Sequence, residues 1–236
     1  MSRVLVLGGS GWVGRAVVRQ LVAAGDDVRF TWHTNERVAG SLPGHPLRVD
    51  LTCRGAMRAL FAELDDDGWT PNALVHAAGL PAGLAVAAAG SPGPGIEEAI
   101  DLAVRIHVTS TITACNEMAA RPLAGLRNVV IFGALDRTQS FPMPAHVAAA
   151  QGGLAAAVMA LGHELGPKGF RVNVVALGLL DGGAADAVPP AQIEAYKRFS
   201  ALRRVGTAEE AAATAVWLVR ENRAINGKVI GANGGI

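Results

Sequence analysis

The segment Gly8-Gly9-Ser10-Gly11-Trp12-Val13-Gly14 decides the fold, because it joins a short apolar run, 3–7, to a helical pattern that begins at Trp12. Glycine in such a turn lets backbone N–H groups approach a pyrophosphate at a helix N-terminus, where the helix dipole favours negative charge. The turn opens the first of a long series of β-α units, which is where a dinucleotide fingerprint belongs. A bare strand-to-helix connector is the alternative. We expect a dinucleotide site made by Gly8, Ser10, Gly11, Trp12, Val13 and Gly14.

Short β-type runs alternate with longer stretches of helical period along the rest of the chain, which predicts a parallel sheet covered by helices. The expected strands are 3–7, 27–32, 46–50, 73–76, 127–132, 171–176 and 228–230. The expected helices are 12–24, 54–64, 96–118, 144–165 and 207–219, the last opened by the Thr207/Glu210 capping box. Right-handed crossovers then give a doubly wound, Rossmann-type α/β sheet of seven parallel strands, with ligands beyond the strands' carboxyl ends.

Composition restricts the class of protein. Half of the 236 residues are hydrophobic and 17% are charged, which fits one domain over 1–236 with a large buried sheet. The net charge of +1 gives no strong electrostatic attraction for phosphate backbones, which argues against a nucleic-acid-binding protein. The longest weakly apolar stretch, near 80–90, is too short to span a bilayer, and no secretory signal is visible. Cys53 and Cys115 have no metal-ligand spacing, so we expect no metal and a cytoplasmic location.

The end of the second expected strand bears on the choice of dinucleotide. Residues 31–35, which include His33, Thr34 and Asn35, contain no carboxylate to accept bonds from a ribose 2′-hydroxyl, and Arg37 lies two places further on. This pattern favours NADP(H), whose 2′-phosphate these side chains can hold. A solvated loop is an equally good interpretation of the same residues.

These landmarks together make the chain resemble the short-chain dehydrogenase/reductase family, and within it the 3-oxoacyl-carrier-protein reductases, over essentially its full length. The resemblance rests on the glycine turn, on Asp50-Leu51, on His76-Ala77-Ala78-Gly79 where the family reads N-N-A-G, on 171–176 and on 226–235. It implies a seven-stranded fold that agrees with the periodicity. It also implies further cofactor-binding residues: Asp50, Leu51, Ala77, Ala78, Gly79 and Gly178.

The chain departs from the family at the catalytic positions. Aligned on the family's Y-x-x-x-K, Val147 takes the Tyr position and Gln151 the Lys position, while Ala134 stands for Ser and His107 for Asn. The chain's one tyrosine, Tyr196, has Ser200 four places later, so no Y-x-x-x-K exists. Loss of a positioned acid costs roughly 10² to 10⁴ in rate, and lost oxyanion stabilisation adds a similar factor. We expect negligible reduction of simple 3-oxoacyl thioesters.

Other residues are candidates for replacement chemistry. His107 and His146 are possible acids or bases at neutral pH, and Gln151 occupies the Lys position; a helix residue bonded to a carbonyl is the plainer interpretation of His107. Asp136 and Arg137 follow the fifth expected strand and are expected to form a surface ion pair, with a functional role as the alternative. Tyr196 and Lys197 fit an amphipathic cover helix after the Gly- and Ala-rich loop 181–190, which is expected to be a lid.

Three hypotheses about function remain open. The first is an NADP(H)-dependent reductase of acyl-carrier-protein-bound or polyketide-like carbonyls that uses an unusual acid. The second is a non-catalytic subunit that pairs with an active reductase. The third is an isomerase or dehydratase that uses His107 or His146. The small-residue face of 148–157, together with the resemblance, implies a homodimer or homotetramer.

Overall fold

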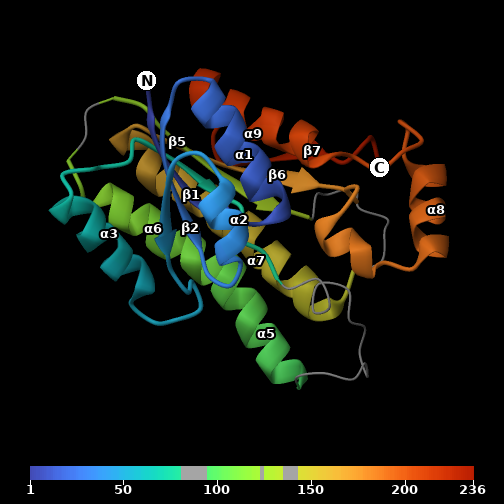
Figure 1. Ribbon diagram of the computed structural model, residues 1–236. Coiled ribbons are helices and arrows are strands. Elements are labelled where there is room, and N and C mark those ends of the chain that lie inside the picture. The colour runs from blue at the N-terminus through green and yellow to red at the C-terminus, as the bar shows by residue number, and fades with distance from the viewer. Residues whose placement is uncertain (81–94, 123–124, 135–142) are drawn as a thin grey trace.

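A seven-stranded parallel sheet forms the centre of the protein. The computed structural model describes residues 1–80, 95–122, 125–134 and 143–236 (Figure 1). Its strand order is β3-β2-β1-β4-β5-β6-β7, with every neighbouring pair parallel. The predicted doubly wound sheet is confirmed. The strands are β1 Arg3–Leu7, β2 Asp27–Trp32, β3 His45–Arg48, β4 Ala73–His76, β5 Arg127–Gly133, β6 Phe170–Leu177 and β7 Lys228–Ala232.

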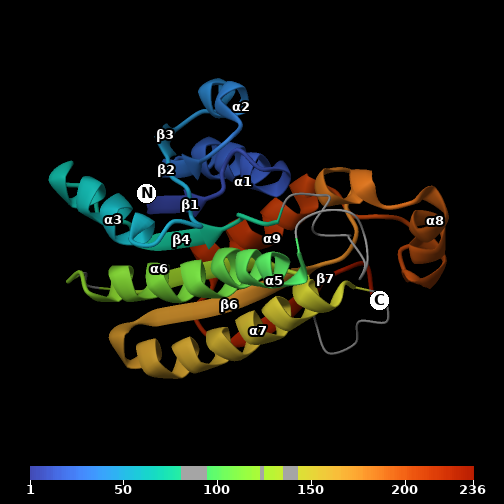
Figure 2. The ribbon, with the colours of Figure 1, turned by 90° about the horizontal axis from the view of Figure 1, so that it is seen from below.

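Helices cover both faces of this sheet (Figure 2). They are α1 Trp12–Ala23, α2 Glu36–Ser41, α3 Ala56–Asp66, α5 Ile96–Val104, α6 Ser110–Ala119, α7 Ala145–Leu165, α8 Pro190–Phe199 and α9 Ala208–Glu221. A π-turn, Arg105–Thr109, joins α5 to α6, and short 3₁₀ turns occupy Gly166–Lys168 and Gly183–Ala187.

Strand residues alternate between two hydrophobic cores because successive side chains point to opposite faces of a sheet. In β1, Val4 and Val6 join the core under α1 and α9, whereas Leu5 and Leu7 join the core under α3, α6 and α7. All four are fully buried. The continuous apolar run of β1 is thus the pattern of a parallel strand covered on both faces.

Several local predictions need correction. The third strand begins one residue earlier and ends two residues earlier than expected, and its side chains are mostly exposed at the sheet edge. The helix expected over 96–118 is divided by the π-turn. The sequence also indicated no helix at Glu36–Ser41, which is a single short turn with one buried residue, Ala39. The cover helix is confirmed as α8. The expected lid contains the 3₁₀ turn Gly183–Ala187, and its movement stays a prediction.

The longest helix, α7, extends with the following 3₁₀ turn over Ala145–Lys168, and by length and composition this stretch alone among the described residues suits a membrane span. Leu154, Val158 and Leu161 of α7 are nevertheless buried in the core against the sheet. The helix therefore serves as a core element of this fold. Its opposite side is exposed and consists mainly of alanine and glycine over its first half, with Met159, His163 and Glu164 further on.

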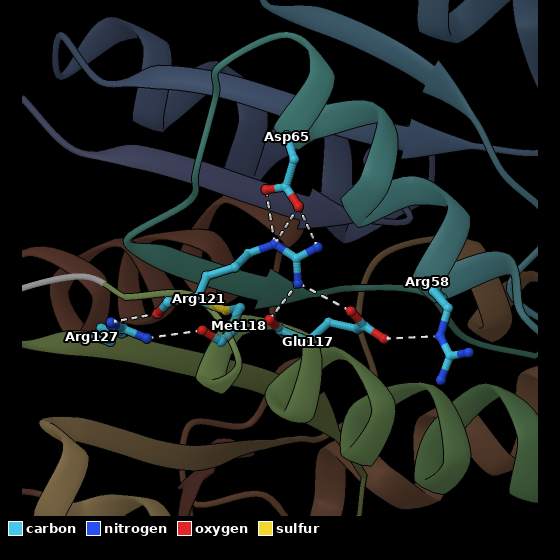
Figure 3. A network of polar contacts seen from close by, with 6 residues as sticks. All are labelled: Arg58, Asp65, Glu117, Met118, Arg121 and Arg127. Atoms are coloured by element: carbon cyan, nitrogen blue, oxygen red, sulfur yellow. Dashed lines mark hydrogen bonds and ion pairs between the residues drawn. The ribbon is translucent and has the colours of Figure 1, made fainter.

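Two arginines stabilise the amino edge of the sheet, by which we mean the end at which the strands begin. They lie between α3, α6 and β5 (Figure 3). Arg121 donates from Nε and Nη2 to the Asp65 carboxylate and from Nη1 to the Glu117 carbonyl at 2.6 Å. Arg127, which opens β5, donates from Nη1 to the Met118 carbonyl at 2.9 Å and from Nη2 to the Arg121 carbonyl at 3.1 Å. These bonds tie carbonyl groups at and just after the end of α6 to the side chains of Arg121 and Arg127, in addition to the Arg121 N–H that the Met118 carbonyl accepts at 3.3 Å.

Candidate functional site

The glycine turn is pressed tightly between neighbouring strands. Gly8 has a φ of 77°, and a Cβ there would lie 2.6 Å from the backbone of Ala78. A Cβ on Gly14 would lie 2.1 Å from the Gly8 carbonyl oxygen. Thr31 of β2 fixes the turn, since its Oγ1 accepts the Gly8 N–H at 2.9 Å and its carbonyl accepts the Gly9 N–H at 2.8 Å. Thr31 was missed in the sequence because a buried threonine in a strand carries no distinctive pattern.

The turn presents the N-terminus of α1 at the carboxyl end of β1. The N-cap is Gly11, which makes no side-chain cap. The first N–H groups of a helix have no intrahelical partners, so those that follow Gly11 suit an anionic group. β1 lies between β2 and β4 in the sheet, which is the point where the strand order reverses and where such folds bind ligands. The residues present therefore fit the pyrophosphate of a dinucleotide.

Trp12, the first residue of α1, bridges the glycine turn to the loop after β6. A Cβ on Gly182 would lie 2.6 Å from its ring, and one on Gly183 would lie 2.9 Å from its Cβ, so only glycine fits beneath the indole. The Arg15 guanidinium lies 4.0 Å from the indole centroid. The indole remains 36% exposed. Its side chain thus packs between α1 and the start of the expected lid.

The adenosine end of the expected site is open. His33, Thr34 and Asn35 are exposed after β2, as is Arg37. His33 Nε2 lies 3.7 Å from Asp50 Oδ2. The Thr52 hydroxyl donates to Asp50 Oδ1 at 2.7 Å and is the main reason that the pKa of Asp50 lies below its usual value.

Other expected cofactor-binding residues lie around the same crevice. Leu51 follows Asp50 and is partly buried, while Ala77 and Ala78 continue β4 beside the glycine turn. Gly79 is exposed. Gly178 follows β6 and lies under Tyr196, whose hydroxyl would be 1.8 Å from any Cβ there. The structure therefore brings the N-terminal turn and the end of β4 together directly.

Two of the expected catalytic positions lie on one buried face of α7. Val147 is buried in the first turns of α7, and Gln151 lies one turn later on the same face, also buried. Gln151 Oε1 accepts the Ala134 backbone N–H at 3.1 Å. The amide therefore ties α7 to the end of β5, and its catalytic role stays a prediction. No proton donor stands at either of these two positions.

Three imidazoles are buried at this end of the sheet, and the pKa is shifted in two of them, His107 and His76. Burial lowers the pKa of His107 to about 4 and that of His76 to about 3, and His107 contributes to the shift of His76. His107 is therefore neutral at pH 7, so it can act as a base or a hydrogen-bonding group but is no source of an imidazolium proton. In the sequence, His76 marks only the resemblance to the family's N-N-A-G motif and is not predicted as a site residue. His146 is buried beside Val147.

The remaining candidates do not supply the missing acid. Tyr196 donates its hydroxyl to the Asn233 carbonyl at 2.8 Å, and burial raises its pKa. Lys197 is bonded to Glu194 at 2.7 Å. Asp136 and Arg137 lie outside the described residues. Within the described ranges, no group of three or more His, Cys, Asp or Glu residues suits a metal ion.

Comparisons with known proteins support this geometry. Residues 10–236 match the family model described as enoyl-(acyl carrier protein) reductase. The chain is 30% identical to the cyclic-di-GMP-binding biofilm dispersal mediator protein of Escherichia coli K12, over 91% of this chain and 88% of that one. It is 26% identical to the 3-oxoacyl-[acyl-carrier-protein] reductase MabA of Mycobacterium avium, over 99% and 89% of the two chains.

A solved structure adds a three-dimensional match. The crystal structure of BdcA in complex with NADPH superposes with a TM-score of 0.85 and 26% identity, over 99% of this chain and 93% of that one. The match extends over the whole sheet and its helices.

Proposed function

Because the chain belongs to the short-chain dehydrogenase/reductase family, we propose that it binds NADP(H) in the crevice at the glycine turn and lacks the family's usual carbonyl reduction. One observation carries the second half of this proposal: Val147 and Gln151 are buried at the positions where a proton donor and a cation are needed. In this proposal the chain shares the fold and the dinucleotide of its family but does not catalyse the family's carbonyl reduction.

Three features support the binding of the dinucleotide. The uncapped N-terminus of α1 and the glycine contacts leave backbone N–H groups for a pyrophosphate. His33, Thr34, Asn35 and Arg37 are exposed where a 2′-phosphate is expected. BdcA, which shares the fold, was solved with NADPH.

The side chains at the other end of the crevice explain the proposed loss of reduction. Bound NADPH supplies a hydride, but an alkoxide formed from a carbonyl must also receive a proton. Val147 has none to donate, Ala134 has no hydroxyl for the substrate oxygen, and the Gln151 amide is neutral. Neutral His107 supports the alternative of an isomerase or dehydratase, in which it acts as a base.

Calorimetric titration with NADPH and NADH tests the binding, and a spectrophotometric assay with a 3-oxoacyl thioester tests the chemistry. We expect tighter binding of NADPH than NADH and no detectable oxidation. Gly14→Val, which places a side chain against the Gly8 carbonyl, should abolish binding, whereas Gly40→Ala, where space is open, should not. Absence of binding by the wild type refutes the first half, and fast NADPH oxidation that survives replacement of His107 and His146 refutes the second.

A second candidate ligand is a cyclic dinucleotide. The Escherichia coli relative is a cyclic-di-GMP-binding protein, and in this chain an exposed Trp12 with Arg15 at 4.0 Å offers an aromatic and cationic surface to a purine base. Competition between NADPH and cyclic-di-GMP distinguishes the two. Displacement of NADPH indicates a shared crevice, and no binding of cyclic-di-GMP removes this candidate.

Partners and location complete the proposal. We propose that the chain forms a homodimer or homotetramer through the exposed alanine and glycine side of α7 and is cytoplasmic, which the free Cys53 and Cys115 support. The mass in solution by light scattering tests the first. A monomer that binds an active reductase of the same family would favour the alternative of a hetero-oligomeric subunit, with an acyl-carrier-protein-bound or polyketide-like compound as the substrate of that partner.

A further inference from the structure

The indole of Trp12 joins two distant parts of the carboxyl edge of the sheet. Trp12 is the first residue of α1, which follows β1, whereas its contacts Gly182 and Gly183 follow β6. The strand order places β4 and β5 between β1 and β6. The contact of the indole with the two glycines therefore connects the first half of the sheet to the second.

This contact is close and depends on glycine. A Cβ on Gly182 would lie 2.6 Å from indole Cζ2 and 2.7 Å from Cε2, and one on Gly183 would lie 2.9 Å from the Trp12 Cβ. The Gly182 φ of 161° is extended backbone that any residue adopts, so the indole alone requires glycine there. The Arg15 guanidinium lies over the ring and adds a contact from the next turn of α1. We call the contact of the indole with Gly182 and Gly183 the Trp12 latch.

Both ends of the expected lid, 181–190, are fixed independently of the Trp12 latch. At its start, the Asp181 N–H donates to the Gly206 carbonyl at 3.0 Å. At its end, α8 is fixed by the Tyr196 hydroxyl, which donates to the Asn233 carbonyl at 2.8 Å. The stretch between these anchors begins with the two glycines, and small residues are common at hinges. The indole thus holds the part of the lid that the anchors leave free.

The two halves of a dinucleotide meet the Trp12 latch differently. In a doubly wound sheet, the pyrophosphate lies at the N-terminus of the helix after β1, and the adenosine ribose lies at the end of the adjacent β2. Residues 33–37 are all exposed there. The nicotinamide half extends the other way, over β4 and β5 towards β6, where the indole contacts Gly182. The adenosine half therefore meets an open surface, and the nicotinamide half meets the indole.

We propose that Trp12 determines which part of the dinucleotide the protein admits. While the Trp12 latch is closed, the protein takes a 2′-phosphorylated adenosine nucleotide. The nicotinamide half enters only after the indole has left Gly182 and Gly183. This order of entry rests on the proposed binding of NADP(H), to which it adds a specificity-determining residue.

The ¹⁹F spectrum of the full chain labelled with 5-fluorotryptophan reports on the indole directly. The chain has four tryptophans, and Trp12→Phe assigns the resonance of Trp12. Gly182→Ala, whose Cβ displaces the ring, gives the position of the released indole without any ligand. NADPH should move the wild-type resonance towards that position, whereas adenosine 2′,5′-bisphosphate, the adenosine half of NADPH, should leave it near its original place.

The Trp217 resonance, from a half-exposed position of α9, is the control and should respond to neither ligand. A Trp12 resonance that the bisphosphate moves to the released position, or that NADPH leaves in place, would overturn the proposal.

Binding kinetics from surface plasmon resonance test the Trp12 latch without replacing Trp12. In Gly182→Ala, NADPH association and dissociation should both become about tenfold faster, because the indole no longer has to leave. Adenosine 2′,5′-bisphosphate should bind with unchanged rates, which also shows that the variant is folded. Gly152→Ala, where a Cβ meets nothing within 4 Å, is the matched control and should behave as the wild type. Unchanged NADPH rates in Gly182→Ala, or equal acceleration of both ligands, would contradict the proposal.

Failure of this inference and failure of the proposed function give different results. If neither NADPH nor the bisphosphate binds to the wild type or to Gly182→Ala, the proposed dinucleotide site is wrong and the order of entry is wrong with it. If both ligands bind but NADPH leaves the Trp12 resonance in place, the dinucleotide site stands and only the role of Trp12 is wrong.

Discussion

The amino and carboxyl edges of the sheet, where the strands begin and end, carry different kinds of buried polar side chain. At the amino edge, Arg121 and Arg127 place guanidinium N–H groups on the carbonyls of Glu117, Met118 and Arg121. At the carboxyl edge, the Nδ1 atoms of His76 and His107 have no partner among the described residues. The two guanidinium groups at the first edge therefore join α3, α6 and β5, whereas burial keeps the two imidazoles at the second edge neutral. Four experiments sharpen this contrast.

The largest expected effect is a loss of stability at mildly acidic pH. His76 and His107 have folded pKa values of about 3 and about 4, below the ordinary 6.5, so the unfolded chain binds more protons between these values. The free energy of unfolding is therefore fully present above pH 6.5 and falls as the pH drops, by about 1.4 kcal/mol per pH unit for each histidine. Urea denaturation at pH 7, 6 and 5 measures it.

His107→Asn should roughly halve this pH dependence, whereas the exposed His163→Asn should leave it unchanged. A flat profile between pH 7 and pH 5 would show that neither ring is held neutral by burial.

The amino edge should be sensitive to loss of a guanidinium. Arg127→Met removes the donors to two carbonyls and the contact with Phe170, whose ring centroid lies 4.9 Å from the guanidinium carbon. We expect a loss of about 3 kcal/mol in the free energy of unfolding, with NADPH affinity unchanged. Arg58→Met, at an 86% exposed side chain, is the control and should cost under about 0.5 kcal/mol. A change in NADPH affinity would mean that the edges are coupled.

At the carboxyl edge, Trp12→Ala should alter the kinetics of binding more than stability. The indole bridges α1 to Gly182 and Gly183, so its removal opens the crevice. Stopped-flow fluorescence should show NADPH association and dissociation both about tenfold faster, which corresponds to about 1.4 kcal/mol in each barrier. Trp217→Ala, at a half-exposed position of α9, is the matched control. Unchanged rates in Trp12→Ala would exclude the indole as a barrier.

The smallest effect is expected at the exposed side of α7. A Cβ on Gly152 meets nothing within 4 Å, so Gly152→Ala should stabilise the isolated chain by about 1 kcal/mol. If two copies pack there, the added methyl groups should also weaken association, which light scattering measures. Gly40→Ala in α2 has equal space and should change stability alone. Unchanged association in Gly152→Ala would place the interface elsewhere.

The sequence predicts most of the sheet well because the strands other than β3 are short, largely apolar runs between turn residues. The Thr207 capping box is present, with Thr207 Oγ1 accepting the Glu210 N–H at 3.1 Å. The glycine turn is predicted equally well, because a pyrophosphate-binding turn requires glycine at fixed spacing. The predicted bounds of edge strand β3 are displaced because its mostly exposed side chains give no alternation of polar and apolar residues.

The site was harder to read, because its contacts join residues distant in sequence. Thr31 looks like an ordinary strand residue, and the π-turn has no composition of its own. Gln151 stands at a catalytic position, yet its amide oxygen accepts a backbone N–H from Ala134, which is visible only in three dimensions.

The extra residue in Arg105–Thr109 has one more consequence. Each residue of an α-helix turns the chain by about 100°, so one inserted residue changes the phase between α5 and α6 by that angle. α5 packs against α7, and α6 packs against α3 as well. The inserted residue therefore allows α5 and α6 to present different faces to their different neighbours. Deletion of one residue within Arg105–Thr109 would rotate α5 relative to α6, so that the packing of α5 on α7 and that of α6 on α3 could not both be kept.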